Sequence, residues 1–317
     1  MKRIGCIVTD LIVMALMGFA IAGCQKPDIA VESVALNKDS LSLTEGESAT
    51  IVATVLPENA SNKKLIWTTS KSGVATVNEG VITAVASGSA TITATSDDGG
   101  KTATCIVMVK RACPAGAVDL GLSVFWASRN IGAGKPEEFG GYYQWAGLEN
   151  ATGTSIYDLN HCPYHIGGQA NSGWTKYVTS KKSSYWSGSG SPDNKTILDP
   201  ADDIAHVKLG GKWRMPTVAE FNELIANCTS EWTTVNGVKG KKFTSKKSGY
   251  TDQWIFLPAA GVRDGTDVYY AGSYGYYWTS SLYTEYPYRA WLFYFSSDNV
   301  TESYFRYDGL SIRPVSE

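Results

Sequence analysis

This 317-residue chain has few histidines and no large excess of charge of either sign. Each of these features argues against a class of function. The three histidines, His161, His165 and His206, limit both metal binding and histidine-dependent catalysis. Lys and Arg number 28 against 30 Asp and Glu, so electrostatic binding to nucleic acid has no support and we expect none. Hydrophobic residues make up 43% and charged residues 18%, which excludes a disordered chain and a coiled coil. The length allows about two domains, each with its own core.

Motifs that carry catalysis or phosphate binding are also missing. The sequence contains no Gly-x-Ser-x-Gly elbow, no His-Glu-x-x-His zinc helix and no Gly-x-Gly-x-x-Gly loop. His161, Cys162 and His165 are close in sequence, but a zinc site needs three or four ligands in tetrahedral reach, and Pro163 opposes a helix that would align the histidines. We therefore expect no metal, no cofactor and no enzymatic activity.

A calcium site has little more support. Asp202 and Asp203 are adjacent, but calcium takes six to eight oxygen ligands. We favour a role for these two acids in a helix cap or a turn.

The first thirty residues have the layout of an export signal. A short positive end at residues 1–3 precedes a mostly apolar stretch that ends in Ile-Ala-Gly, directly before Cys24. A cysteine in this context resembles the lipobox of bacterial lipoproteins, in which the thiol is acylated after cleavage. We expect a signal peptide over residues 1–23, lipidation of Cys24 and an anchor linker over residues 24–30. Two or three acyl chains make a stable membrane anchor.

The residues after Cys24 bear on the side of the membrane that is reached. Residues 25–28 (QKPD) resemble the short acidic-ended signal of Bacteroidota lipoproteins on the outer face. This resemblance implies an outer-membrane lipoprotein that is lipid-anchored and faces the cell exterior.

The aromatic residues divide the remaining chain into two parts. Only Trp67 lies between residues 28 and 110, whereas every other aromatic residue except Phe19 follows residue 110. Pro114 and Gly116 mark the change. We expect two domains, over residues 31–110 and 114–317.

The first of these parts has the pattern of a β-sandwich. Small polar and apolar residues alternate over residues 48–55, 90–95 and 103–109, with turn residues between the runs. The pattern predicts seven or eight strands, with Trp67 as the one large side chain in the middle.

Several short motifs resemble the bacterial Ig-like group 2 family. They lie at residues 34–37 (VALN), 41–46 (LSLTEG), 56–60 (LPENA), 67–70 (WTTS), 74–77 (VATV), 80–84 (GVITA) and 88–94 (GSATITA). The resemblance implies an all-β Ig-like sandwich used as a spacer or adhesive module. We favour a spacer, because no aromatic cluster is available here for direct ligand contact.

The second part predicts a helix and several strands. Thr217 with Glu220 forms a capping-box pattern before an apolar stripe that runs from Phe221 to Cys228. Trp291, Phe293 and Phe295 alternate with Leu292 and Tyr294, as on the two faces of a strand; further strands are expected at residues 254–257, 276–280 and 310–314. One or two helices against a mostly antiparallel sheet is an α+β arrangement.

This part resembles the Fibrobacter-type major paralogous domain family, which is common in Bacteroidota lipoproteins. The motifs lie at residues 118–127 (VDLGLSVFWA), 139–145 (FGGYYQW), 201–206 (ADDIAH), 211–217 (GKWRMPT), 256–261 (FLPAAG), 277–281 (YWTSS) and 311–315 (SIRPV). Their order is also similar to C-type-lectin-like folds. That resemblance implies that the strands at residues 123–127 and 310–315 lie close together. The calcium-and-sugar motifs of lectins are absent, so sugar binding would not use that calcium.

Cysteines beyond Cys24 can form disulfides in an exported protein. Cys105, Cys113, Cys162 and Cys228 allow three connectivities, and the sequence does not choose among them. Cys105, inside a predicted strand, suits a buried free thiol, and Cys162–Cys228 is the first pairing to test.

Tyrosines interspersed with Gly, Ser, Thr and Asp form the best candidate binding surface, because such residues give large contact area at low entropy cost. The candidates are Tyr269, Tyr270, Tyr274, Tyr283, Tyr286, Tyr288 and Arg289. Any single ring could instead fill an irregular core, but we expect some of this group to be exposed.

Together these features predict a non-enzymatic outer-membrane lipoprotein. An Ig-like stalk would present an aromatic, lectin-like head that binds a glycan or protein on a host or neighbouring cell. The alternative is a structural subunit or tip component of a surface assembly.

Overall fold

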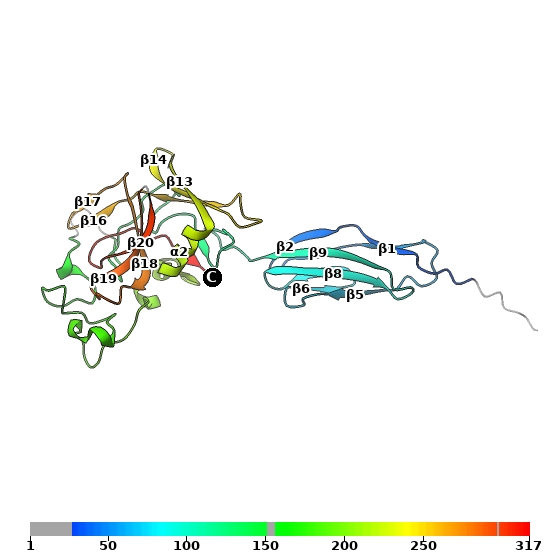
Figure 1. The fold of residues 1–317 in the computed structure, drawn as a ribbon, viewed down its shortest axis with the longest axis horizontal. Helices are drawn as coiled ribbons and strands as arrows, with labels where there is room; N and C mark the ends of the chain where they lie inside the picture. The colour runs from blue at the N-terminus through cyan, green and yellow to red at the C-terminus, as the bar shows by residue number, and fades with distance from the viewer. Residues whose placement is uncertain (1–26, 151–155, 297) are drawn as a thin grey trace, which may run out of the picture. The chain divides into compact units, whose positions relative to one another are not determined.

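The computed structural model describes residues 27–150, 156–296 and 298–317 (Figure 1). The expected signal peptide and the lipidation site at Cys24 lie outside the described residues. The chain divides into two compact units between Ala112 and Cys113. No helix in the described ranges is long and apolar enough to cross a membrane.

The first unit contains strands only. Its four-stranded sheet has the order β2-β9-β8-β5, a second sheet has the order β3-β7-β6, and β1 pairs with β4. The strands are β1 (Ser33–Leu36), β2 (Ser40–Thr44), β3 (Ser48–Thr50), β4 (Ala53–Leu56), β5 (Leu65–Thr69), β6 (Ala75–Asn78), β7 (Val81–Ala84), β8 (Gly88–Ser96) and β9 (Thr102–Lys110). All pairs are antiparallel except β2 and β9, which run parallel.

The prediction of seven or eight strands was too low, because the expected run over residues 48–55 is broken. The Ile51 amide donates to the Gly80 carbonyl at 2.9 Å, and the Val52 amide donates to Asn37 Oδ1 at 2.9 Å. The chain thereby leaves β7, the partner of β3, and joins β1, the partner of β4. Nine strands result within residues 33–110.

Trp67 lies inside the sandwich, as predicted from the sequence. Its half-buried ring packs against both hydrophobic clusters of the first unit, one around Ile82 and Ile92 and the other around Val34 and Val55. One large ring thus joins two clusters of small side chains.

The second unit is mostly β-structure with few helices. Its sheets have the orders β10-β11-β21-β12, β13-β14-β15, β16-β17 and β18-β19-β20. The strands are β10 (Ala117–Val118), β11 (Phe125–Ala127), β12 (Trp213–Arg214), β13 (Cys228–Val235), β14 (Val238–Ser245), β15 (Trp254–Pro258), β16 (Val262–Asp264), β17 (Asp267–Tyr269), β18 (Gly275–Leu282), β19 (Arg289–Phe295), β20 (Asn299–Phe305) and β21 (Val315–Ser316). The helices are η1 (Leu159–His161), η2 (Ser180–Tyr185), η3 (Pro200–Asp202), α1 (Ile204–Leu209) and α2 (Val218–Asn227), of which the η elements are 3₁₀-helices.

The ends of the second unit meet in one sheet. Trp126 of β11 pairs with Val315 of β21, so the expected proximity of the first and last strands is confirmed. A strand over residues 310–314 was a wrong prediction, because only Leu310 and Ser311 form isolated bridges there. Pro314 has no amide proton to give to a ladder.

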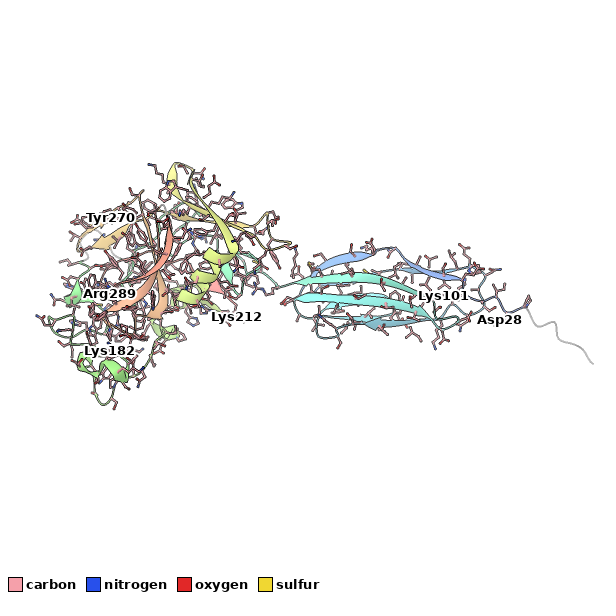
Figure 2. All side chains as sticks on the ribbon, viewed as in Figure 1. Asp28, Lys101, Lys182, Lys212, Tyr270 and Arg289 are labelled. Atoms are coloured by element: carbon pink, nitrogen blue, oxygen red, sulfur yellow. The ribbon has the colours of Figure 1, made fainter. Side chains whose placement is uncertain are left out.

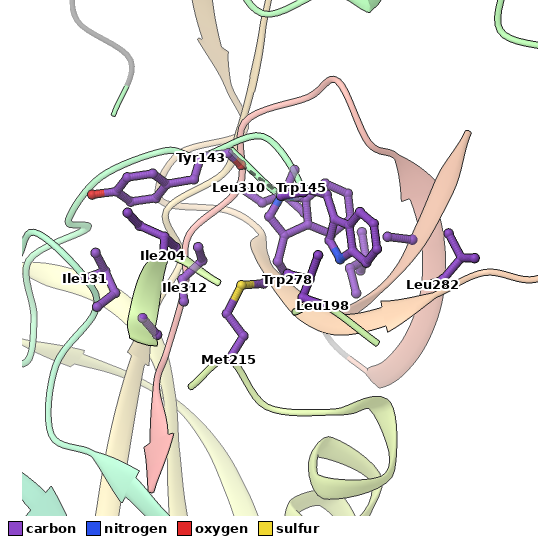
Figure 3. Close-up of a cluster of buried hydrophobic side chains, with 14 of the residues drawn as sticks. Ile131, Tyr143, Trp145, Leu198, Ile204, Met215, Trp278, Leu282, Leu310 and Ile312 are labelled. Atoms are coloured by element: carbon purple, nitrogen blue, oxygen red, sulfur yellow. Dashed lines mark hydrogen bonds between the residues drawn. The ribbon is translucent and has the colours of Figure 1, made fainter. Parts of the chain in front are cut away.

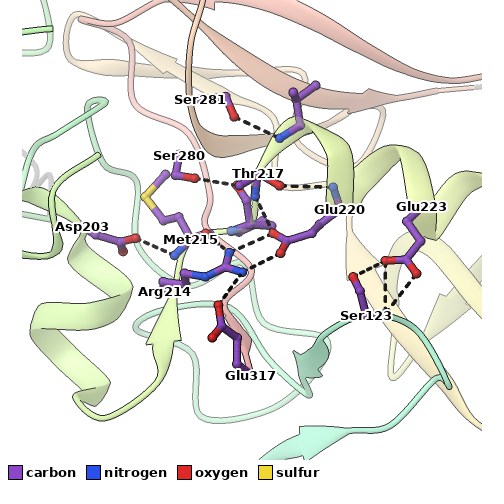
Figure 4. Close-up of polar contacts among 12 residues, drawn as sticks. Ser123, Asp203, Arg214, Met215, Thr217, Glu220, Glu223, Ser280, Ser281 and Glu317 are labelled. Carbon is purple, nitrogen blue, oxygen red and sulfur yellow. Dashed lines mark hydrogen bonds and ion pairs between the residues drawn. The ribbon is translucent and has the colours of Figure 1, made fainter. Parts of the chain in front are cut away.

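The predicted helix is confirmed as α2, with both halves of the capping box present (Figure 4). The Glu220 amide donates to Thr217 Oγ1 at 3.3 Å, and the Thr217 amide donates to Glu220 Oε2 at 2.7 Å. Arg214 binds both carboxylate oxygens of Glu220 at 2.6 and 2.9 Å. Burial opposes ionisation, but the hydrogen bonds from Arg214 hold the pKa of Glu220 below its usual value.

The sheet β18-β19-β20 lies between two hydrophobic clusters. Leu292 belongs to one cluster, which also contains Trp145 and Trp278 (Figure 3), whereas Phe293 and Phe295 belong to the other. This division confirms the alternation expected for β19. Tyr276, Tyr294 and Tyr304 pack at the margin of the first cluster.

Candidate binding surface

Two of the predicted tyrosines stand at the end of the β16–β17 hairpin. Tyr269 is 46% exposed and Tyr270 is 56% exposed. The turn after them is tied down because the Ser273 and Tyr274 amides both donate to the Tyr270 carbonyl at 3.0 Å. Gly261 (φ +70°) allows the close approach, since a Cβ there would lie 2.1 Å from the Tyr269 carbonyl oxygen. These two rings are therefore held at the surface by a fixed backbone.

Strand tyrosines continue this group across the sheet. Tyr276 and Tyr294 are cross-strand partners with ring centroids 5.0 Å apart, and Tyr304 lies 5.8 Å from Tyr276. Tyr274 joins them to Tyr270, at 5.8 Å from Tyr294 and 5.3 Å from Tyr270. We call these rings the tyrosine surface: Tyr269, Tyr270, Tyr274, Tyr276, Tyr294 and Tyr304.

Two hydroxyls of the tyrosine surface, those of Tyr276 and Tyr304, stay protonated over the physiological range. Burial, and next the neighbouring tyrosines, raise the pKa of Tyr276. Burial, followed by Asp308 and Asp264, raises the pKa of Tyr304. Each such hydroxyl can both donate and accept a hydrogen bond.

The other three predicted tyrosines lie in the loop between β18 and β19. Tyr286 is 45% exposed, and its ring lies between those of Tyr283 at 6.1 Å and Tyr288 at 5.6 Å. Lys182 places its Nζ 5.7 Å from the Tyr286 ring centroid and 3.2 Å from Glu285 Oε2. We call Tyr283, Tyr286 and Tyr288 the loop tyrosines.

Phe305 connects the two groups. Its ring lies 5.9 Å from Tyr304 and is stacked on Tyr288 at 6.0 Å. Arg289 is half-buried, with its guanidinium 4.9 Å above Phe305 and Nη1 donating to Ser303 Oγ at 3.2 Å. Arg289 therefore supports this junction through its own contacts (Figure 2 labels it with Tyr270).

The structure thus joins the predicted tyrosines into one chain of ring contacts, through residues that were not predicted from the sequence to bind a ligand. Tyr276, Tyr294 and Tyr304 supply the connection, together with Phe305. The alternation along β19 places Tyr294 on the face of Leu292, but nothing in the sequence predicts that Tyr276 is its partner. Predicting this pair would have required the register between β18 and β19.

An acidic pair lies beside Tyr304. The antiparallel bridge between Arg263 and Gly309 places Asp264 opposite Asp308, where cross-strand Cβ atoms are about 4.5–5.5 Å apart. Asp308 is 3% exposed, and its carboxyl makes no hydrogen bond with the described residues. Burial, and next Asp264, raise the pKa of Asp308 to about 8.

A second polar group of the same unit is a network centred on Asp202. Asp202 accepts hydrogen bonds from Tyr164, Tyr177 and Lys176, and Lys176 also binds Asp199 Oδ2 at 2.7 Å. Burial works against ionisation, but hydrogen bonds from Lys176 and then the tyrosines keep the pKa of Asp202 below its usual value. The Asp202 carboxylate is therefore engaged in contacts within the protein, and we do not assign it to ligand binding.

Asp203 has the cap role that the sequence favoured. Its Oδ1 accepts from the Ala205 and His206 amides as the N-cap of α1, and its Oδ2 accepts from the Met215 amide at 2.7 Å. The His-Cys-Pro-Tyr-His segment is a loop, in which His161 Nδ1 lies 2.7 Å from Asp158 Oδ1. Within the described ranges, no group of three His, Cys, Asp or Glu side chains could hold a metal ion.

The Cys162–Cys228 disulfide was a wrong expectation. Both thiols are free and buried, in two different hydrophobic clusters: Cys162 packs with Trp174, and Cys228 packs with Phe221 and Leu224. Burial raises the pKa of Cys162 to about 12 and that of Cys228 to about 11. Cys105 is a buried free thiol, as its strand position predicts.

Comparisons with known proteins address the two units separately. Residues 30–107 match the bacterial Ig-like domain (group 2), and residues 230–315 match a domain of unknown function (DUF8237). Kappa-carrageenase of Pseudoalteromonas carrageenovora is 44% identical over 79 residues, which are 25% of this chain and 20% of that enzyme. An Ig-like virion protein of Serratia phage KSP90 is 40% identical over 83 residues, 26% of this chain and 32% of that protein.

These matches are partial. The chain spans only 20% and 32% of the length of these two relatives, and the match to the carrageenase is confined to an Ig-like segment. Domains 4 and 5 of the S-layer protein SbsC match with 26% identity over 25% of this chain and 51% of that chain, but the TM-score of 0.21 is too low for us to draw anything from it. Residues 30–107 therefore form a bacterial Ig-like domain of group 2.

Proposed function

We propose that this chain is a non-enzymatic lipoprotein of the outer bacterial surface, anchored in the outer membrane through Cys24 and facing the exterior. Its Ig-like domain acts as a spacer. Its second unit, a C-type-lectin-like domain of the Fibrobacter type, binds a glycan or protein ligand on a host or neighbouring cell through the tyrosine surface and the loop tyrosines. The Ig-like domain supports a surface or structural protein at the coarser level.

The continuous chain of ring contacts is the observation that carries this proposal. Tyr269, Tyr270 and Tyr286 are exposed. Of the half-buried rings between them, four lie on paired strands: Tyr276, Tyr294, Tyr304 and Phe305. Flat aromatic faces suit the apolar faces of sugar rings, and the tyrosine hydroxyls supply hydrogen bonds at the edges. A rigid aromatic platform of this kind binds without a large entropy cost.

A glycan array probed with the purified chain tests this proposal. Tyr270→Ala and a Tyr283→Ala/Tyr286→Ala double variant should each weaken binding about tenfold or more, since a loss of about 1.4 kcal/mol is tenfold. Trp254→Ala, on β15, is the matched control, because Trp254 is 42% exposed against 45% for Tyr286, and it should bind as the wild type does. Unchanged binding by both tyrosine variants would remove this surface, and turnover of a bound glycan would overturn the non-enzymatic assignment.

The membrane anchor has its own test. Cys24→Ser should abolish incorporation of labelled fatty acid and release the protein from the membrane fraction, because the acyl chains need the thiol. Labelling of the variant at the wild-type level would contradict the lipoprotein assignment.

A structural subunit or tip component of a surface assembly is the second candidate. On β9, Ile106 is 55% exposed and Met108 is 50% exposed, so the Ig-like domain presents two neighbouring apolar side chains. In this case the purified chain should self-associate in light scattering, and Ile106→Ser/Met108→Ser should abolish the association. A monomer at all concentrations would dismiss self-assembly.

A further inference from the structure

A cavity of about 460 Å³ opens on the second unit, away from the aromatic rings described above. Small-molecule sites commonly have volumes of about 300–1,000 Å³, so a hexose-sized body fits this space. Its lining shares no residue with the tyrosine surface or the loop tyrosines. The lining includes Arg129, Asn130, Ile131, Tyr143, Lys208 and Trp213.

The floor of the cavity is preformed. The Ile131 amide donates to the Ile312 carbonyl at 3.0 Å, and the Ile131 carbonyl accepts from the Gly141 amide at 2.9 Å. Asn130 donates to the Phe139 carbonyl at 2.8 Å and accepts from the buried Arg313 Nε at 2.8 Å. A floor held on several sides spares a ligand the cost of ordering it.

Tyr143 directs an unused polar group into this cavity. The residue is 3% exposed, with its ring at the edge of the hydrophobic cluster in Figure 3 and its hydroxyl pointing away from Trp145 and Trp278. None of the described residues forms a hydrogen bond with this hydroxyl. Burial raises the pKa of Tyr143, so the hydroxyl remains a donor at neutral pH.

Two glycines keep the surroundings of this hydroxyl open. A Cβ at Gly132 would lie 3.5 Å from Tyr143 Oη, and a Cβ at Gly141 would lie 2.6 Å from it. Side chains at these positions would cover the group or displace it. The space around the Tyr143 hydroxyl therefore depends on glycine at positions 132 and 141.

The charges along the cavity are all of one sign. Arg129 and Lys208 are exposed cations, and no carboxylate is among the lining residues. Arg129 uses Nη1 to donate to the Gly134 carbonyl at 3.0 Å, which orients the guanidinium. The nearby acid Glu138 is occupied by the Gly134 and Lys135 amides. Two cations and one hydroxyl donor favour a negatively charged oxygen group.

We propose that this cavity binds a hexose-sized ligand that carries an oxyanion, either a carboxylate or a sulfate. Arg129 and Lys208 receive the anionic group, the Tyr143 hydroxyl donates a hydrogen bond to the ligand, and Ile131 with Trp213 contacts its apolar face. This is a second site, independent of the glycan or protein ligand assigned to the tyrosine surface.

Titration calorimetry of the purified chain with glucuronic acid, glucose 6-sulfate and glucose, at low salt, tests the proposal. At least one of the two anions should bind, glucose should bind at least tenfold more weakly, and comparison of the two anions distinguishes carboxylate from sulfate. Failure of both anions to bind, or equal binding of glucose, would overturn the proposal.

Variants separate this site from the tyrosine surface. Arg129→Gln/Lys208→Gln should weaken binding of the anion at least tenfold, and Tyr143→Phe should weaken it about tenfold, because each variant removes a hydrogen-bond donor to a charged group. Lys181→Gln, an exposed lysine elsewhere on the unit, should change nothing. Tyr270→Ala should also leave anion binding intact, so either site can fail alone. Wild-type affinity in the double variant would refute the assignment even if the anion binds.

Discussion

Arg306 is a fully buried cation in the aromatic core of the second unit, and aromatic faces surround its guanidinium. Its guanidinium carbon lies 4.6 Å from the Trp145 ring centroid and 4.2 Å from that of Trp174. Nη1 donates to the Pro287 carbonyl at 2.9 Å, while Nε and Nη2 have no partner among the described residues. Burial lowers the pKa of Arg306 to about 10, so it is still charged at neutral pH. Stacking between two indoles offsets part of the cost of burying this charge.

Arg306→Lys should therefore destabilise the protein by about 2 kcal/mol or more, although the charge is kept. An ammonium cannot stack between two rings, and it is more strongly hydrated than a guanidinium. Urea unfolding followed by tryptophan fluorescence measures the change. The matched control is Arg129→Lys at an exposed position, where a shift within about 0.5 kcal/mol is expected. Equal shifts in the two variants would contradict this role of the stacking.

Asp308 makes stability depend on pH in an unusual direction. An aspartate in the unfolded chain loses its proton near pH 4, whereas Asp308 in the folded protein keeps it to about pH 8. Between these values the folded state binds more protons, so this residue lowers stability as the pH rises.

Asp308→Asn removes that dependence. The variant should gain stability relative to the wild type from pH 4 to pH 8, by no more than about 1.4 kcal/mol per pH unit, and the added difference should vanish below pH 4. Thermal unfolding of both proteins across this range gives the measurement. A gain that is largest at acidic pH would show the opposite linkage and contradict the buried, protonated state.

At the scale of elements, α2 depends on its first turn. Thr217→Ala removes the side-chain acceptor for the Glu220 amide, and loss of such a cap costs about 1 kcal/mol. Thr217→Ser keeps the hydroxyl and should remain near the wild type. Chemical unfolding of the three proteins tests this. Equal destabilisation by Ala and Ser would show that the threonine methyl, rather than the cap, matters.

Two turns of the first unit, β2–β3 with Gly46 and β6–β7 with Gly80, offer a matched pair of glycines. Gly80 (φ +82°) and Gly46 (φ +84°) share a backbone conformation, but a Cβ at Gly80 would lie 2.5 Å from the Ile51 carbonyl oxygen, and one at Gly46 meets nothing within 4 Å. Gly46→Ala should cost about 1 kcal/mol for its positive φ, and Gly80→Ala about 2 kcal/mol or more. The difference in unfolding free energy between the variants isolates the crowding; its absence would contradict it.

Elements marked by local chemistry could be predicted from the sequence, and those set by distant partners could not. The Thr217 and Glu220 pattern fixes α2, and the alternation around Leu292 fixes the two faces of β19. The break at Ile51 depends on a hydrogen bond to Gly80, which no local signal predicts.

The same limit applies to the candidate surface. Tyr270 and Tyr286 could be picked out by their loop composition, but their connection through Tyr276 and Tyr294 needs the strand register. Asp308 and Arg306 have the sequence of an exposed turn and are buried only because distant segments cover them. Secondary-structure propensity does not show which distant segments will bury a residue.

At the scale of the whole molecule, the two units have separate cores. Each of the five hydrophobic clusters lies entirely within residues 27–112 or within residues 113–317. We expect the full chain to unfold in two calorimetric transitions that match those of the separate fragments. A single transition, or a fragment that fails to fold, would show that the units depend on each other.

The parallel pairing of β2 with β9 has a mechanical consequence. Ser40 pairs with Ile106 and Thr44 with Lys110, so the two strands run in the same direction. A pull on the chain before Ser40 and after Lys110 drags these strands past each other along their length. The hydrogen bonds of the ladder then share the load in shear instead of opening one at a time, so this pair of strands resists stretching.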